Sequence, residues 1–301
     1  MRRTFIKKEG MALTTLARYL LGEQCGNRLK TIDELAGECG SSVGLTQAAL
    51  KTLESSGAIR IERRGRNGSY LVDMDNKALL AHIDISNVVC AMPLPYTRLY
   101  EGLASGLKAQ FEGIPFYYAH MRGADIRVEC LLNGVYDMAV VSRLAAESYL
   151  AQSGLSMAMA LGPHTYVGEH QLICRKGEIG EVRRIGLDNR SPDQKIMTEI
   201  YFAGRDVERV YLSYHESLSR IAKGEIDAVI WNVAAGDELT MLGLEAQPLS
   251  GDPRFLLATE AVVLTRSDDY PIQHLLRAVV DKQALLAHQQ RVVSGEQEPS
   301  Y

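Results

Sequence analysis

The chain has 301 residues, of which 46% are hydrophobic and 23% are charged, and its formal net charge is −4. This composition is typical of a globular protein, and the length suits two or three domains better than one small one. No stretch approaches the roughly 20 consecutive apolar residues of a membrane span, so we expect no membrane partner.

The five cysteines are widely spaced and form no Cys-x-x-Cys pair: Cys25, Cys39, Cys90, Cys130 and Cys174. We therefore expect buried thiols in a reducing compartment and neither disulfides nor a zinc site. The first eight residues are basic like the start of a signal peptide, but Arg18 interrupts the apolar run that should follow. The sequence thus predicts a cytoplasmic protein, and it shows no motif for a metal or another cofactor.

The N-terminal residues 1–76 begin with two predicted helices. Met11–Leu21 places its leucines on one helical face, which is typical of a helix packed on that face. Thr31-Ile-Asp-Glu34 is a capping box, in which each side chain can bind the backbone amide of the other residue. It predicts a helix over Ile32–Cys39.

A third helix and a hairpin complete this N-terminal part. Ser41 and Ser42 can cap a helix over about Val43–Ser56. Residues 59–72 alternate between apolar and polar on both sides of a turn at 65–68, as a β-hairpin does.

Two helices joined by a short turn and followed by a hairpin with a basic tip form a shape that binds DNA. The second helix would lie in the major groove, and the tip would meet phosphates or the minor groove. Residues 1–76 hold twelve Lys and Arg against nine Asp and Glu, whereas the remainder holds 21 against 28. The predicted DNA contacts are Ser42, Gly44, Gln47, Lys51, Arg63, Arg64, Arg66 and Asn67.

Five runs in this part resemble the winged helix of GntR-type bacterial repressors. They are Leu21-Gly-Glu, Arg28-Leu29, Thr31-Ile-Asp-Glu-Leu-Ala36, Leu50-Lys-Thr-Leu-Glu-Ser-Ser-Gly-Ala-Ile59 and Arg64-Gly-Arg66. The resemblance covers about a quarter of the chain and implies operator DNA as a partner.

The start of the third predicted helix departs from the GntR-type pattern. That family often has arginines where this chain has Val43 and Gln47. Glutamine can bind an adenine edge, whereas valine cannot hydrogen-bond a base. The alternative is therefore a winged helix that serves as a protein-contact module.

A short unit occurs twice in the rest of the chain. Residues 131–142 and 221–232 share the spacing of Gly134 and Asp137, which recurs as Gly224 and Asp227. Each copy reads as a helix end, a glycine cap and a buried strand. The repeat predicts two similar α/β lobes with a ligand cleft between them.

The elements predicted for these lobes alternate between strand and helix, which favours parallel sheets. The joint at 77–84 is partly apolar and predicts a short helix or strand. In the first lobe we expect strands at 85–91, 115–120 and 137–141, with helices at 96–111 and 125–133. The chain then crosses at 170–174. In the second lobe we expect strands at 184–187, 207–212 and 227–231, with helices starting near 191 and 214. Residues 259–265 return to the first lobe, and one outer helix spans about 271–290.

Two α/β lobes with two crossing segments resemble the type 2 periplasmic-binding-protein fold, which also forms the effector domain of LysR-type regulators. With a GntR-like head, this arrangement resembles the YhfZ family of enteric bacteria. It implies an α/β chain with a winged helix-turn-helix domain at 1–76, a linker at 77–84 and a two-lobed effector domain at 85–301. Lobe 1 would comprise about 85–168 and 256–301, and lobe 2 about 169–255. The smaller effector domain of many GntR relatives is the alternative.

A ligand in such a fold lies beyond the carboxyl ends of the strands, where helix N-termini favour anions. The candidate ligand residues are Tyr96, Thr97, Ser142, Arg143, Asn189, Arg190, His215, Trp231 and Asn232. The arginines could bind a carboxylate or phosphate, and the aromatic rings could form apolar walls. Alternatively, capping boxes at 191–194 and 213–216 occupy the helix amides, and Trp231 is a core residue.

The sequence contains none of the common hydrolase, metalloprotease or phosphate-binding motifs, so we expect no enzyme. The leading hypothesis is a ligand-responsive transcription regulator that binds operator DNA and a small, anionic metabolite. Reading two half-sites would need a homodimer or a higher homo-oligomer. The alternatives are a small-molecule-binding protein without DNA binding and an enzyme on a binding-protein fold.

Overall fold

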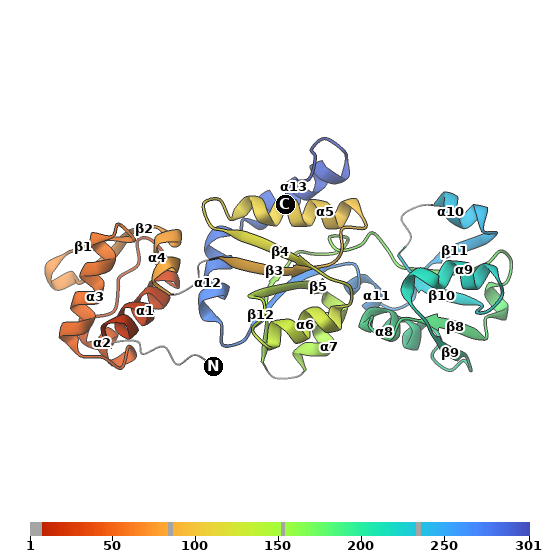
Figure 1. Cartoon of the computed structure of the whole chain (residues 1–301), viewed down its shortest axis with the longest axis horizontal. Helices are drawn as coiled ribbons and strands as arrows, with labels where there is room; N and C mark the ends of the chain where they lie inside the picture. The colour runs from red at the N-terminus through yellow and green to blue at the C-terminus, as the bar shows by residue number, and fades with distance from the viewer. Residues whose placement is uncertain (1–7, 84–86, 152–153, 233–235) are drawn as a thin grey trace. The chain divides into compact units, whose positions relative to one another are not determined.

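A computed structural model describes residues 8–83, 87–151, 154–232 and 236–301. The chain forms two compact units (Figure 1). The first unit comprises residues 1–88, 111–116 and 269–280, and the second comprises the remainder. The basic residues at 1–7, the end of the predicted joint at residue 84 and the start of the strand predicted at 85–91 lie outside the described residues.

The first unit contains the predicted helices and hairpin. The capping box at Thr31 is confirmed, because its hydroxyl accepts from the Glu34 amide while its own amide donates to the Glu34 carboxylate over 2.7 Å. The apolar faces of the helices and the hairpin form the core, in which Leu16, Leu53 and Leu71 are fully buried. The elements are α1 (Lys8–Leu21), α2 (Ile32–Glu38), α3 (Val43–Ser55), β1 (Ile59–Arg63), η1 (Gly65–Asn67), β2 (Ser69–Met74) and α4 (Asn76–His82).

The first unit also includes α12 (Tyr270–Val279), which packs against α1. The single helix predicted over 271–290 is wrong, since the chain forms α12 and a separate α13 (Lys282–Val293). Val280 is extended between them, and the Asp281 side chain caps α13 by accepting from the amides of Gln283 and Ala284.

The second unit contains two five-stranded mixed sheets, and we call each sheet with its helices a lobe. The strand order in the first lobe is β4-β3-β5-β12-β6. Its β3 and β5 are parallel as predicted, and β12 returns to this sheet as predicted, antiparallel to β5 and β6. The lobe contains β3 (Val88–Met92), α5 (Arg98–Gln110), β4 (Phe116–His120), α6 (Ala124–Leu132), β5 (Met138–Ser142), α7 (Arg143–Leu150), β6 (Leu155–Ala160), β12 (Ala261–Arg266) and α13.

The strand order in the second lobe is β11-β7-β10-β8-β9. Its strands β8, β9 and β10 run parallel, whereas β7 is antiparallel to β10 and β11 is antiparallel to β7. The segment at 170–174, predicted only as a crossing, belongs to strand β7. The lobe contains β7 (Gln171–Arg175), η2 (Ile179–Glu181), β8 (Arg184–Leu187), α8 (Pro192–Tyr201), β9 (Glu208–Tyr211), η3 (Tyr214–Glu216), α9 (Ser217–Ala222), β10 (Ala228–Trp231), α10 (Gly236–Met241), β11 (Leu244–Pro248) and α11 (Arg254–Leu257).

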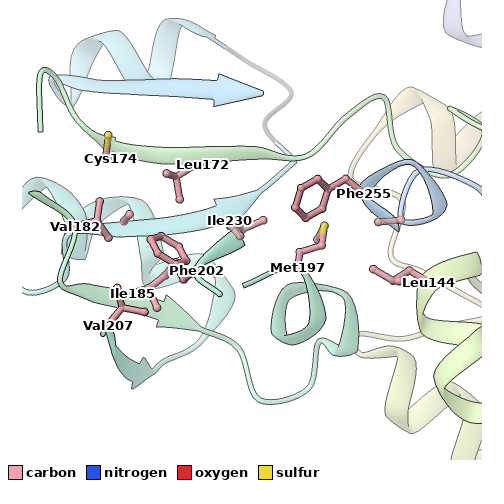
Figure 2. Close-up of a cluster of buried hydrophobic side chains, with 12 residues drawn as sticks. Leu144, Leu172, Cys174, Val182, Ile185, Met197, Phe202, Val207, Ile230 and Phe255 are labelled. Carbon is pink, nitrogen blue, oxygen red and sulfur yellow. The ribbon is translucent and has the colours of Figure 1, made fainter. Parts of the chain in front are cut away.

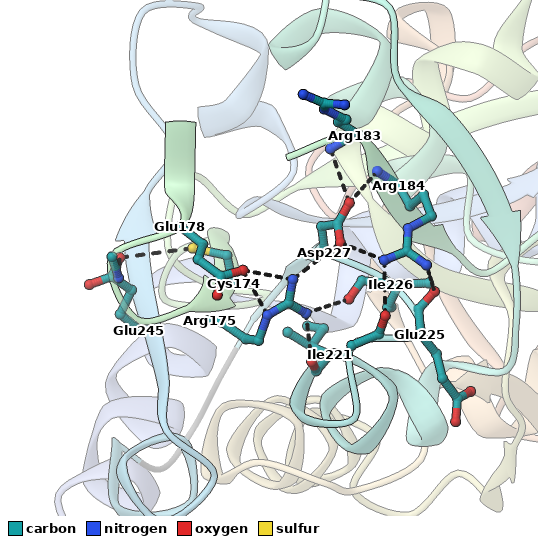
Figure 3. Close-up of polar contacts among 12 residues, drawn as sticks. Cys174, Arg175, Glu178, Arg183, Arg184, Ile221, Glu225, Ile226, Asp227 and Glu245 are labelled. Atoms are coloured by element: carbon teal, nitrogen blue, oxygen red, sulfur yellow. Dashed lines mark hydrogen bonds and ion pairs between the residues drawn. The ribbon is translucent and has the colours of Figure 1, made fainter. Parts of the chain in front are cut away.

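The repeated Gly-x-x-Asp unit ties neighbouring strands together in each lobe. The Asp137 carboxylate accepts from the Val89 amide over 2.8 Å, and its amide donates to the Val89 carbonyl. Asp227 makes the same pair of bonds with Arg184 and also binds the Arg175 and Arg184 guanidinium groups (Figure 3). Burial raises the pKa of Asp227, but these hydrogen bonds outweigh it and lower the pKa to about 2. The repeat therefore fixes strand register.

The two lobes share an apolar contact. Leu144 of α7, in the first lobe, belongs to the same buried cluster as Met197 of α8 and Phe255 of α11 (Figure 2). The cluster continues into the core of the second sheet through Ile230. Burial of these side chains stabilises the relative position of the elements at the lobe boundary.

Candidate functional site

A cavity of about 140 Å³ lies between the two lobes, and we call it the interlobe cavity. From the first lobe it is lined by the loop after β3, the loop after β4 and the N-terminal part of α6. From the second lobe it is lined by the ends of β8 and β10 and the start of α8. It therefore lies beyond the carboxyl ends of parallel strands, where the fold predicts a ligand.

A buried arginine forms one wall of the interlobe cavity. Arg127 of α6 is 3% exposed and donates to the carbonyls of Val140 and Met121 and to the Tyr166 hydroxyl, over 2.9–3.0 Å. These bonds use three of its five N–H groups. In the described part of the chain no carboxylate is within ion-pair distance of Arg127, although its charge lowers the pKa of Asp193 in the same cavity.

Sequence analysis did not identify Arg127 as a site residue. A signal was present, because Arg127 falls in the apolar stripe that α6 buries with Ala124, Val128 and Leu131. An arginine in a buried stripe is uncommon unless it has a partner or a function.

Asp193 contributes a carboxyl group to the same cavity. The Ser142 hydroxyl donates to it over 2.6 Å and accepts from the Ala145 amide, so Ser142 joins the two lobes. Burial raises the pKa of Asp193 to about 6, although the Ser142 hydrogen bond and the Arg127 charge lower it. The carboxyl group is therefore partly protonated near neutral pH.

His170 lies where the chain enters the second lobe, and it lines the cavity as a neutral imidazole. Burial lowers the pKa of His170 to about 4. Its Nδ1 atom is buried and has no hydrogen-bond partner among the described residues. The ring nitrogen is thus available to a polar ligand atom.

Arg122 reaches across the mouth of the cavity. It donates to the Tyr96 hydroxyl over 2.9 Å and lies 3.3 Å from Nδ1 of His215 in the second lobe. Together with the Ser142–Asp193 bond, this contact links the lobes by side chains that a ligand could displace or reinforce.

Four of the nine predicted ligand residues line the cavity: Tyr96, Arg190, Trp231 and Asn232. The other five, Thr97, Ser142, Arg143, Asn189 and His215, do not line it. Thr97 caps α5, and the guanidinium of Arg143 is held by Glu147 and Glu260 over 3.0 and 3.1 Å. Asn189 is exposed. His215 lies outside the cavity lining but contacts Arg122, which lines the cavity.

One of the two capping boxes predicted in the second lobe forms in part, and the other does not form. Ser191 accepts from the Gln194 amide over 3.2 Å. Gln194 does not reach back to Ser191 but bridges the Asp188 amide and the Ile230 carbonyl. The Glu216 carboxylate binds Arg220 instead of capping the helix at Ser213.

The predicted DNA contacts lie on an exposed face of the first unit. Ser42 caps α3 through the Leu45 amide, over 3.3 Å. Gly44, Gln47 and Lys51 are exposed along α3.

The tip of the hairpin has fewer free charges than its sequence implies. Arg63 makes a two-bond contact with Glu54 of α3 over 2.6 and 3.1 Å, and Arg64 is bound to Glu62 over 2.7 Å. Arg66 and Asn67 are exposed at η1, and no side-chain partner of either is seen among the described residues.

Within the described ranges, no helix is both long and apolar enough to cross a bilayer, and no three His, Cys, Asp or Glu side chains are grouped to hold a metal ion.

Comparisons with known proteins match both parts of the chain. Residues 75–301 match the family model of the YhfZ C-terminal domain, and residues 24–71 match a helix-turn-helix domain. The chain is 85% identical over all 301 residues, and over the whole of its relative, to the YhfZ protein of Escherichia coli K12. The helix-turn-helix match is not specific to the GntR type.

Two solved structures agree with this assignment. The crystal structure of YhfZ from Shigella flexneri is 83% identical in sequence and has a TM-score of 0.70. The match covers 75% of this chain and 98% of the Shigella chain. The second structure is the amino acid substrate-binding protein AbpA from Streptococcus pneumoniae, solved with L-arginine. It is 13% identical and has a TM-score of 0.51, and the match covers 70% of this chain and 94% of AbpA. It shares the fold of the second unit. The chain belongs to the YhfZ family, with an N-terminal helix-turn-helix domain and a C-terminal domain of the binding-protein fold.

Proposed function

We propose that the protein is a cytoplasmic transcription regulator in which a small anionic metabolite in the interlobe cavity controls operator binding by the helix-turn-helix domain. The observation that supports this most directly is the combination of two features on one chain. One is an exposed α3 face in a domain that matches helix-turn-helix proteins. The other is a cavity lined by a buried arginine without a carboxylate partner in the described part of the chain.

The domain assignment of this proposal follows the sequence. Residues 1–76 bind DNA, residues 77–84 link, and residues 85–301 form the effector domain, with lobe 1 at about 85–168 and 256–301 and lobe 2 at about 169–255. A homodimer or higher homo-oligomer would present paired heads to two half-sites. The GntR-like character of the head is part of the proposal.

The charge of the cavity favours an anion. The cavity lining includes three arginines, Arg122, Arg127 and Arg190, and two acidic residues, Asp188 and Asp193. Burial favours the neutral form of Asp193. A cavity near 140 Å³ is similar in size to engineered cavities that hold benzene, which points to a compact ligand. Arg127 would hold a carboxylate or phosphate, and Tyr96 and Trp231 would cover its apolar part.

The test begins with the purified full-length protein and the DNA upstream of its own operon. We expect binding that is sequence-selective and weakens with salt. A thermal-shift screen of small carboxylates, phosphate esters and uncharged analogues of equal size would then identify ligands. A ligand should raise the melting temperature and change DNA affinity by about 5- to 150-fold.

The matched variants are Arg127→Lys and Arg209→Gln. Arg127 lines the cavity, whereas Arg209 is exposed on β9, outside the cavity lining. Arg127→Lys should abolish the thermal shift while DNA binding persists without ligand, and Arg209→Gln should change neither. A ligand response that survives Arg127→Lys would contradict the anion site.

A binding protein without DNA recognition is the second candidate. It is favoured by the ion pairs that occupy Arg63 and Arg64 and by Val43 at the start of α3. The same measurements separate the two, because this candidate predicts ligand binding together with equal affinity for operon and random DNA.

A further inference from the structure

The exposed face of α3 has an unusual composition for a helix that would read DNA. Val43 is 38% exposed, and the other exposed positions of α3 are Gly44, Gln47, Ala48, Lys51, Thr52 and Ser55. The first two turns of this face therefore present methyl groups, a bare backbone and one amide. The only cation on α3, Lys51, comes a further turn along the helix.

Each of these groups matches one kind of base edge in the major groove. The glutamine amide can donate and accept at once, which fits the N7 and N6 atoms of adenine. The side chains of Val43 and Ala48 fit the methyl group of thymine, and Gly44 lets the helix come close. Guanine is most often read by arginine or lysine. In the N-terminal part of the helix, which meets the bases in this motif, no such cation is present.

The hairpin arginine that contacts α3 is also unavailable to guanine. Arg63 enters from the hairpin, but both of its terminal nitrogens bind the Glu54 carboxylate on α3. This contact instead fixes the hairpin to the helix.

The hairpin tip gives an independent indication of the same preference. Arg66 is exposed beside Asn67 and Gly68, and the described residues offer it no carboxylate partner. An arginine without a carboxylate partner at a hairpin tip suits the minor groove of A-tracts, which is narrow and strongly negative.

We propose that the helix-turn-helix domain recognises an A·T-rich half-site, in which Gln47 reads adenine, Val43 and Ala48 contact thymine methyl groups, and Arg66 enters a narrow minor groove. The inference rests on the proposed DNA-binding function and specifies its target. It excludes a half-site whose central contacts are to guanine.

The test is selection of sequences from a random duplex library by the full-length protein. We expect enriched half-sites with A·T pairs at the contacted positions. In the selected duplex, replacing one thymine by deoxyuracil removes only its methyl group and should weaken binding roughly fourfold. Replacing the contacted adenine by 7-deazaadenine removes N7 and should weaken binding about tenfold.

Variants assign these effects to side chains. Gln47→Ala should make binding insensitive to 7-deazaadenine, and Val43→Ala should remove the deoxyuracil effect at one position. Lys51→Ala is the control, because it should weaken binding to all sequences alike. All three residues are exposed, and circular dichroism would verify that each variant folds.

A selected half-site with guanine at the contacted positions would overturn the inference while leaving the regulator intact. Enrichment of A·T pairs whose analogue effects are unchanged in Gln47→Ala and Val43→Ala would also overturn it. A library from which no sequence is enriched would overturn both the inference and the proposed regulator.

Discussion

Arg127 combines a structural role with the binding role that we propose for it. Its three hydrogen bonds satisfy the carbonyls of Met121 and Val140 and the Tyr166 hydroxyl. Removing it would eliminate all three hydrogen bonds, each of which contributes about 0.5–1.5 kcal/mol. We therefore expect Arg127→Ala to lower the free energy of unfolding by about 2–5 kcal/mol.

Urea denaturation followed by the fluorescence of Trp231, the single tryptophan of the chain, would measure this change. The control is Arg190→Ala, because Arg190 is exposed and should alter stability by less than about 0.5 kcal/mol. Equal stability of the two variants would show that Arg127 has no structural role.

Asp193 should make stability depend on pH. Burial raises its folded-state pKa to about 6, whereas the unfolded-state value is near 4. The protonated Asp193 carboxyl group therefore contributes its full stability below about pH 4, and this contribution is lost as the pH rises through about 6. Relative to Asp193→Asn, the wild-type protein should lose up to about 3 kcal/mol of unfolding free energy between pH 4 and 7.

His170 makes the stability depend on pH in the opposite direction, over an overlapping pH range. Because burial lowers its folded-state pKa to about 4, its contribution is lost as the pH falls from about 6.5 towards 4. Comparing wild type with Asp193→Asn at each pH cancels the histidine term. A constant difference between the two unfolding free energies would contradict the burial of the Asp193 carboxyl group.

At the scale of elements, two glycines let α5 and α13 approach closely. A Cβ atom at Gly102 would lie 2.9 Å from the Gln289 carbonyl oxygen, and one at Gly106 would lie 3.1 Å from that of Leu285. Both neighbours are backbone atoms, so they cannot move aside as a flexible side chain could. We expect Gly102→Ala to destabilise the protein by about 1–3 kcal/mol.

The matched change is Gly37→Ala, since Gly37 also lies in a helix but has open space at its Cβ position. Without a clash, the higher helix propensity of alanine should stabilise the protein by up to about 1 kcal/mol. Thermal unfolding followed by circular dichroism would compare the two. The packing argument fails if both substitutions shift the melting temperature in the same direction.

Elements defined by local chemistry could be predicted from the sequence. The capping box at Thr31 and the glycine caps of the Gly-x-x-Asp repeat depend on neighbouring residues, and both appear in the structure. Strand β6 could not be predicted, because all of its residues are half-buried and show no alternation. Parallel pairing was predicted for both sheets, but the antiparallel strands come from segments far apart in the chain.

The candidate site was less predictable than the fold. Tyr96, Arg190, Trp231 and Asn232 follow strand ends, and that rule placed them at the cavity. Arg127 reaches it from inside a helix, which only the packing of α6 on the sheet reveals. Ion-pair partners are equally hidden, because Glu260, which holds Arg143, lies 117 residues away.

At the scale of the whole molecule, the DNA binding that we propose would depend on charges that are partly neutralised by ion pairs. In a narrow minor groove, Arg66 should neutralise about one phosphate charge, so Arg66→Ala should weaken binding and reduce the log–log salt slope by about 0.9. Glu62→Gln should act in the opposite direction by releasing Arg64 from its ion pair. Titrations by fluorescence anisotropy between 50 and about 200 mM salt would measure both slopes.

Arg205→Ala serves as the control for these slopes, because Arg205 is exposed in the second unit, against the Phe202 ring. It should leave the salt slope unchanged. An equal fall in the slope for Arg205→Ala and Arg66→Ala would indicate that the charge of the whole protein, and not the hairpin tip, determines DNA affinity.

The position of β12 has a consequence for synthesis. This strand lies between β5 and β6 in the first sheet, yet it starts only at Ala261. The ribosome therefore completes α1 to α4 long before the first sheet can close, and domains generally fold in the order in which they emerge. However, α12, which packs against α1 in the first unit, follows β12 in the chain, so premature termination before Ala261 would leave both the first unit and the first sheet incomplete.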